Sequence, residues 1–165
     1  MRLQDIYATP WHGLPLRVDV VAHAPPVGAN SVVLSPEGGH ILVASSVAFV
    51  DALEIIFHEA SHTIMSSRRQ DPVPAALKRA AAKLEIPLPR DLWHVVLFFL
   101  TGEVVKERIS EVTEREYLPY IIRHNLWRSS WGEYRYAVEK VLPAYVKNEI
   151  SLSEAAVELI SALDR

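Results

Sequence analysis

The sequence predicts an α+β domain, with strands in the first third of the chain and helices in the remainder. Before Val47, short segments alternate apolar and polar side chains or flank a turn sequence, as strands do. From Val47 onward, apolar residues recur at the spacing of one helix face. Strands followed by helices are typical of the α+β class. With 165 residues, the chain is expected to form one domain, residues 1–165, that is large enough to bury a core.

The strand region is expected to hold three short strands. Residues 14–21 alternate apolar with polar side chains over most of their length, which is typical of a half-buried strand. Residues 31–35 and 40–44 flank the turn sequence PEGG at 36–39, so they are predicted to pair as a hairpin. The sequence PPVG at 25–28 is predicted to form a loop.

The rest of the chain is predicted to be mainly helical. Residues 47–65 contain neither glycine nor proline and carry a buried-type apolar stripe. Residues 74–84 are rich in alanine and begin with a proline, which suits the first turn of a helix. A long helix is predicted over 91–112, with Asp91 as its N-cap. Further helical segments are predicted at 117–127, 131–146 and from 151 or 153 to 163.

Composition excludes several classes of function. Half of the residues are hydrophobic and 22% are charged, the balance of a folded protein. The net charge of −3 does not indicate a nucleic acid or an anionic membrane as partner, and it indicates no oligomeric state. The longest apolar run, 95–100, is far shorter than the roughly 20 residues of a membrane span. The chain has no cysteine, so any metal site must use His, Asp, Glu or backbone atoms.

The N-terminal residues carry no localisation signal. Residues 1–6 lack the apolar core of a signal peptide. We therefore expect a cytoplasmic protein if Met1 is the natural start, and an exported one if a signal peptide has been removed.

The strongest functional signal is His58-Glu59-Ala60-Ser61-His62. On a helix, residues four apart share a face, so the imidazoles of His58 and His62 can face one cation. Neutral histidine nitrogen binds zinc at roughly 2.0–2.1 Å. Glu59 points about 100° away around the axis, where its carboxylate can reach a water molecule instead of the metal. The motif predicts Zn²⁺ bound by the two histidines, with Glu59 as the general base. The alternative is a helix whose histidines only satisfy nearby polar groups.

A catalytic zinc usually has three protein ligands, and a glutamate on the next long helix is the predicted third one. Glu103 lies 41 residues beyond His62. Glu107, one turn later, is expected to accept a hydrogen bond from a ligand imidazole. The alternative interpretation is an exposed acidic ladder paired with Lys106 and Arg108.

His94 is the competing third ligand. It lies nine residues before Glu103 on the same predicted helix. That separation is about 13.5 Å along the axis and half a turn around it. The two side chains therefore cannot bind the same ion unless the helix breaks between them, and outside the site His94 is expected to pack beside Trp93.

The oxyanion of an amide hydrolysis needs a hydrogen-bond donor. Polar and aromatic side chains gather around Pro119, where the predicted helix is interrupted. Tyr120 and His124 are the predicted donors, with Tyr117 and Arg123 beside them. Aromatic packing is the alternative role for the tyrosines.

The motif and the glutamate that follows it resemble the gluzincin metallopeptidases, in which HExxH is completed by a downstream glutamate. Glu103 matches that glutamate, and Glu107 matches an acid four residues later in thermolysin-like enzymes. Finer features resemble a family of small bacterial proteins, some of them secreted, over roughly residues 15–160. These features are Leu92-Trp93-His94, Thr101-Gly102-Glu103 and Tyr117-Leu118-Pro119-Tyr120.

The resemblance implies a zincin-like core, in which a small twisted sheet lies beside the HExxH helix and a second helix bears the glutamate. It also implies an edge strand above the metal that holds extended peptide, for which residues 40–45 are the candidate. Unlike the larger enzymes, this chain has no sizeable second domain. The expected function is a zinc-dependent hydrolase acting on a peptide or protein substrate. The alternatives are a non-catalytic zinc-binding regulatory or interaction domain, and a helical interaction module with a chance motif.

Overall fold

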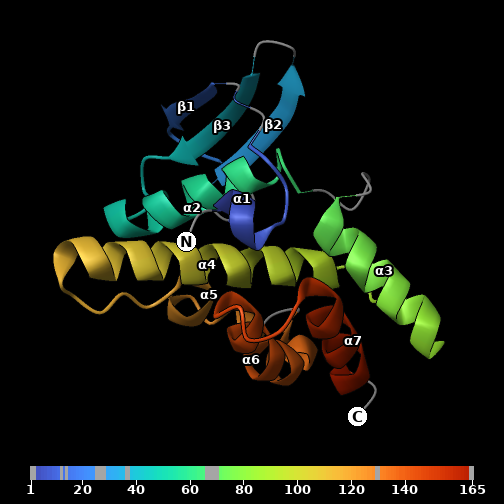
Figure 1. Cartoon of the computed structure of the whole chain (residues 1–165). Coiled ribbons are helices and arrows are strands. Elements are labelled where there is room, and N and C mark those ends of the chain that lie inside the picture. The colour runs from blue at the N-terminus through green and yellow to red at the C-terminus, as the bar shows by residue number, and fades with distance from the viewer. Residues whose placement is uncertain are drawn as a thin grey trace.

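A three-stranded sheet lies on one side of a group of helices (Figure 1). The computed structural model describes residues 3–11, 13, 15–24, 29–35, 38–65, 71–128 and 131–163. Its strands are β1 (Leu16–Val21), β2 (Ala29–Ser35) and β3 (Gly38–Ala44). The α+β class is confirmed, with strands preceding nearly all of the helices.

The strand order is β1-β3-β2. β1 runs parallel to β3, with Val18 opposite Ile41. β2 runs antiparallel to β3, with Ser31 opposite Ile41, so the predicted hairpin pairing is confirmed. The predicted loop at 25–28 and the first half of the turn at 36–39 lie outside the described residues.

The expectation that residues 40–45 form an edge strand is wrong. β3 is the central strand, because both of its sides pair with neighbours: His40 lies opposite Arg17 on one side and Val32 on the other. The edges of this sheet are β1 and β2. The sequence could not show this order, because a hairpin partner can be either the central strand or an edge.

The helices of the described part of the chain follow the predicted segments closely. α2 begins two residues later than predicted, and α3 begins two residues earlier at a proline that follows Asp71. The helices are α1 (Leu3–Ile6), α2 (Phe49–Ser61), α3 (Pro72–Leu84), α4 (Leu92–Thr113), α5 (Tyr120–Arg123), the 3-10 helix η1 (Leu126–Arg128), α6 (Gly132–Val146) and α7 (Leu152–Leu163).

The segment 117–127 departs from the prediction of one helix. Pro119 precedes α5, where its fixed φ starts a new helix. Asn125 then adopts a positive φ of 51°, which ends regular α-helix and separates α5 from η1. The short α1 was not predicted, because four residues are too few to show helical periodicity.

The long helix α4 forms the centre of the molecule. Figure 1 shows it crossing between α2 on one side and α6 and α7 on the other. This position explains the run Val95 to Leu100, in which every side chain is buried and no polar face remains. A helix that is apolar all round is one that is covered on all sides. Each fully buried side chain of this size contributes roughly 1.5–3 kcal/mol to folding. No described helix is both long enough and apolar enough to cross a bilayer.

Candidate metal centre

The HExxH motif occupies the last turn of α2, which packs between the sheet and α4. His58 and Glu59 are buried, with 2% and 8% of their surfaces exposed. His62 is the C-cap residue, and its helical φ and ψ of −60° and −20° extend the helical spacing to the end of the motif. His58 and His62 therefore share a face of α2, as predicted from their spacing.

α4 brings a third imidazole to this pair. His94 lies in the first turn of α4, and its ring centre is 5.2 Å from that of His58 and 5.0 Å from that of His62. Ligand atoms of the three histidines all lie within 4.8 Å of one another. The Nε2 atoms of His58 and His94 are 3.2 Å apart. This is a three-histidine group of the kind that binds catalytic zinc.

Aromatic side chains from α4 and from the start of α6 surround the histidines. The Phe98 ring stacks on His58 with a centre-to-centre distance of 3.6 Å. Trp93 stacks on His94, and Trp131 meets His94 edge-on, each at 5.3 Å. These rings supply a low-dielectric surrounding and fix the imidazole planes.

Burial keeps the three histidines neutral. It lowers the pKa of His58 well below 6.5, and positive charge on His62 or His94 would lower it further. Burial, followed by the effect of His94, lowers the pKa of His62 to about 4. Burial also lowers the pKa of His94, although Asp91 acts in the opposite direction. Neutral imidazoles have a free lone pair, so at pH 7 no proton has to leave before a metal binds.

The donor set fits zinc, and so does the separation of the His58 and His94 nitrogens. Four-coordinate zinc with bonds of 2.0–2.1 Å places its ligand atoms roughly 3.3 Å apart. The distance of 3.2 Å between the Nε2 atoms of His58 and His94 agrees with that separation. Nδ1 of His58 is buried and has no hydrogen-bond partner within the described part of the chain. A ligand imidazole is usually oriented by a hydrogen bond from its second ring nitrogen to an acceptor. No described residue supplies that acceptor for His58.

Glu59 directly follows His58 in the chain, but its carboxylate does not belong to the group of three ligand residues. Its carboxylate accepts hydrogen bonds from the hydroxyl and the backbone N–H of Ser31 on β2. Burial raises the pKa of Glu59, and the two bonds from Ser31 offset part of that rise. Ser31 was not singled out from the sequence, since a serine in a predicted strand gives no signal of which helix it meets.

The structure brings His94, rather than Glu103, to His58 and His62. α4 is continuous from Leu92 to Thr113, so Glu103 lies roughly 13.5 Å along the axis from His94. Its carboxylate pairs with Lys106, 3.4 Å away. The competitor His94, and not Glu103, therefore belongs to the three-histidine group, because the crossing point of α4 over α2 falls at the first turn of α4.

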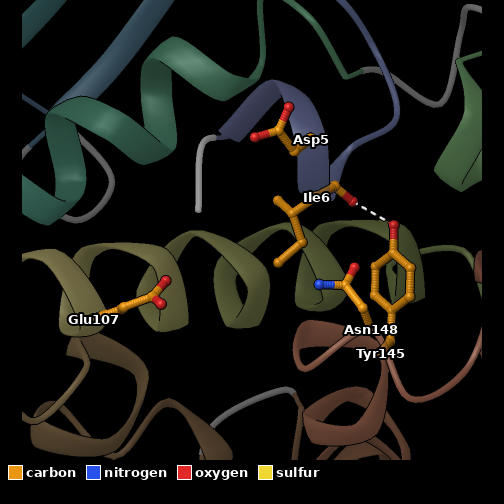
Figure 2. Close-up of a pocket in the computed structure, with 5 residues that line it drawn as sticks. All are labelled: Asp5, Ile6, Glu107, Tyr145 and Asn148. Atoms are coloured by element: carbon orange, nitrogen blue, oxygen red, sulfur yellow. Dashed lines mark hydrogen bonds between the residues drawn. The ribbon is translucent and has the colours of Figure 1, made fainter.

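Glu107, the predicted outer acceptor, lines a different cavity of about 340 Å³ between α1, α4 and the end of α6 (Figure 2). In Figure 2, Glu107 lies on α4 at the left, and Asn148 and Tyr145 lie together at the right. The Tyr145 hydroxyl donates to the carbonyl oxygen of Ile6 at 2.6 Å, which ties α6 to α1. Glu107 therefore does not serve His94, which is thirteen residues earlier on the same helix.

The segment that holds Tyr120 and His124 attaches to the first half of α2. His124 Nε2 lies 2.9 Å from a carboxylate oxygen of Asp51, and Arg123 pairs with the other oxygen. Asp51 precedes His58 by seven residues, or roughly 10 Å along the helix. The Tyr120 ring stacks on His124 at 3.9 Å. The oxyanion role of Tyr120 and His124 stays a prediction.

A second buried carboxylate on α2 holds the same segment. Glu54, 1% exposed, accepts a hydrogen bond from the Tyr117 hydroxyl at 2.6 Å and from the Tyr120 N–H at 2.8 Å. Burial raises the pKa of Glu54, against the opposing effect of these hydrogen bonds. Asp51 and Glu54 were not identified from the sequence. Both lie on the buried face of α2 with Ile55 and His58, whereas Val50 and Phe57 of the predicted apolar stripe are exposed, so the prediction of that stripe as the buried face is wrong and apolar periodicity did not indicate these carboxylates.

Comparison of the chain with protein-family models, with curated proteins and with solved structures finds no match.

Proposed function

We propose that this protein is a zinc-dependent hydrolase with a zincin-like arrangement, and that it cleaves an amide bond in a peptide or protein substrate. One observation carries the proposal: three neutral histidines, His58 buried and the other two partly buried, converge from α2 and α4, and the buried Glu59 directly follows His58 in the chain. A purely structural zinc site has no need of that carboxylate, and it usually takes four protein ligands.

Each residue has a distinct role in the proposal. His58, His62 and His94 hold the ion through neutral ring nitrogens. Bound zinc supplies the Lewis acidity that makes a water molecule nucleophilic near neutral pH. A carboxylate oxygen of Glu59 accepts the proton of that water and then donates it to the nitrogen of the leaving amine. A raised pKa suits this task, because it brings the carboxylate closer to the pH at which it must both take and give a proton.

The edge strand β2 favours a peptide as the substrate. β2 pairs with β3 on one side only, so its other edge is available to an extended chain within the described sheet. Ser31 on this strand contacts Glu59, so a peptide added along β2 would run past the general base. Tyr120 and His124 complete the proposal as predicted oxyanion donors, a role that requires α5 to touch the bound substrate.

The test is turnover of a quenched-fluorescence peptide library by zinc-loaded wild type and by Glu59→Gln, with zinc content measured on both. Glu59→Gln preserves shape and removes the base, so we expect full zinc content and a loss of activity of roughly 100- to 10,000-fold. Equal activity of wild type and Glu59→Gln would contradict the role of Glu59 as the general base. Stoichiometric zinc with no turnover of any peptide would favour the non-catalytic zinc-binding domain.

A further inference from the structure

A cavity of about 490 Å³ lies on the side of α2 opposite the histidines. Leu53, Ile56 and Phe57 of α2 form one wall, and Val104 and Ile109 of α4 form another. On the helical wheel, the α2 residues of this wall lie roughly 180° from His58 and His62. The cavity is therefore separate from the proposed metal centre, and its volume is typical of a small-molecule site.

The remaining lining comes from α1, the segment after it and the start of β1. Leu3, Trp11 and Leu16 close the cavity with apolar side chains. Five separate parts of the chain thus line one cavity, which distinguishes it from the surface of a single amphipathic helix.

Apolar surface continues from the cavity along α2 and α4. Phe57, at the mouth, is 41% exposed, and Phe49, two turns earlier on the same face of α2, is 85% exposed. Val112, one turn beyond Arg108 on α4, is 65% exposed. Phe57 lines the cavity, and Phe49 and Val112 extend the exposed apolar surface along the two helices that form its walls, which indicates a binding surface for apolar ligands.

One charged group stands at this site. Among the described lining residues, Arg108 alone carries a charge, and its side chain is 70% exposed. It donates to Glu111 at 2.6 Å. An exposed pair of this kind is weak, and a guanidinium has five N–H donors, so Arg108 can also hold an anion.

The low polarity of the lining also determines which class of ligand fits. Apart from Arg108, Gln4 is the only polar side chain among the described lining residues. A peptide segment buried here would leave backbone N–H and C=O groups without hydrogen-bond partners, which is unfavourable for each group. A hydrocarbon chain has no such groups.

We propose that this cavity binds a carboxylate with a long hydrocarbon chain, with the chain between α2 and α4 and the carboxylate on Arg108. The apolar walls match the chain, and the single cation at the mouth matches the head group in charge. This site is independent of the proposed hydrolase function.

The test is isothermal titration calorimetry with octanoate, decanoate and dodecanoate, all below their micelle concentrations. Each methylene buried contributes about 0.8 kcal/mol, so affinity is expected to rise roughly fourfold per added carbon. Arg108→Gln is expected to weaken dodecanoate binding roughly tenfold and to leave dodecanol binding unchanged, since only the charged hydrogen bond is lost. Arg115→Gln, which removes the same charge just after α4, is the matched control and is expected to change neither.

Two further measurements separate this site from its alternatives. A carboxylate can bind zinc, so the titration is repeated on His62→Ala, where unchanged affinity is expected and loss of binding would overturn the proposal. Sedimentation at the same protein concentration tests whether a second copy of the chain covers the apolar surface. A dimer that binds no carboxylate would overturn the proposal, as would an affinity that does not depend on chain length.

Discussion

Burial of His58, His62 and His94 gives them the one property that a metal ligand needs at pH 7, an unprotonated nitrogen. The same burial makes the metal-free protein sensitive to acid. Nothing in the pentapeptide motif alone shows how deeply its histidines are buried. The aromatic surround that produces the pKa shifts comes from Trp93 and Phe98 on α4 and from Trp131.

The metal-free protein is expected to lose stability as the pH falls from about 6.5 to about 4. In this window the unfolded chain protonates His62, whose ordinary pKa is 6.5, while the folded chain holds it neutral down to about 4. The loss for His62 is on the order of 3 kcal/mol. The raised pKa of Glu59 has the opposite effect. The folded protein binds this proton more tightly than the unfolded chain does, so Glu59 stabilises the fold as the pH falls. Urea denaturation in a chelating buffer at several pH values measures the slope, and His62→Gln should reduce it. An unchanged slope in that variant would contradict the burial of a neutral His62.

Ser31→Ala is expected to lower turnover without lowering zinc content. The variant removes the hydroxyl that donates to Glu59 and retains the backbone N–H. Losing one hydrogen bond to a carboxylate costs about 1–2 kcal/mol, or roughly a tenfold fall in kcat. Ser45→Ala, an exposed serine just beyond β3, is the control. A variant that loses zinc together with activity would show that Ser31 supports the fold of the site rather than the base.

At the level of elements, the contact between α2 and the segment before α5 explains why position 102 of α4 is a glycine rather than a larger residue. A Cβ at this position would be 3.0 Å from Glu54 Oε1 and 3.0 Å from Pro119 Cβ. Both neighbours are constrained, Glu54 by its hydrogen bonds to Tyr117 and Tyr120 and Pro119 by its ring. The glycine therefore permits the close approach of three segments, although it sits in the interior of a helix.

Gly102→Ala is expected to destabilise the protein. Alanine favours a helix over glycine by about 1 kcal/mol, but overpacking against constrained neighbours costs about 1–3 kcal/mol. We expect a net loss of roughly 1 kcal/mol in the free energy of unfolding, measured by chemical denaturation. Glu111→Ala, on the exposed part of α4, should have little effect. A clearly stabilised Gly102→Ala protein would show that the Glu54 side chain moves aside freely.

Helix and strand positions followed from local patterns to within a few residues, because amphipathic periodicity is recorded in each segment separately. What those patterns did not contain is the arrangement between segments. The central place of β3 and the split of residues 117–127 into α5 and η1 depend on sheet order and on the buried carboxylates of α2. In both cases the deciding partner lies far away in the sequence.

At the scale of the whole molecule, α4 determines the composition of the candidate site. The spacing of His58 and His62 and the role proposed for Glu59 come from one helix, so the sequence could predict them. The third ligand depends on where α4 crosses α2. Helix geometry showed that His94 and Glu103 exclude one another, and only the packing of α4 between two layers places His94 at the crossing.

Zinc coordination in wild type, His94→Ala and Glu103→Ala tests this central claim most directly. We expect one zinc per chain in wild type, with X-ray absorption showing three imidazole nitrogens. His94→Ala should weaken zinc binding by at least roughly 100-fold, because a three-histidine site loses a ligand. Glu103→Ala should bind zinc as wild type does, since its carboxylate pairs with Lys106. Two imidazoles and a carboxylate in wild type, with zinc lost in Glu103→Ala and retained in His94→Ala, would contradict the three-histidine centre.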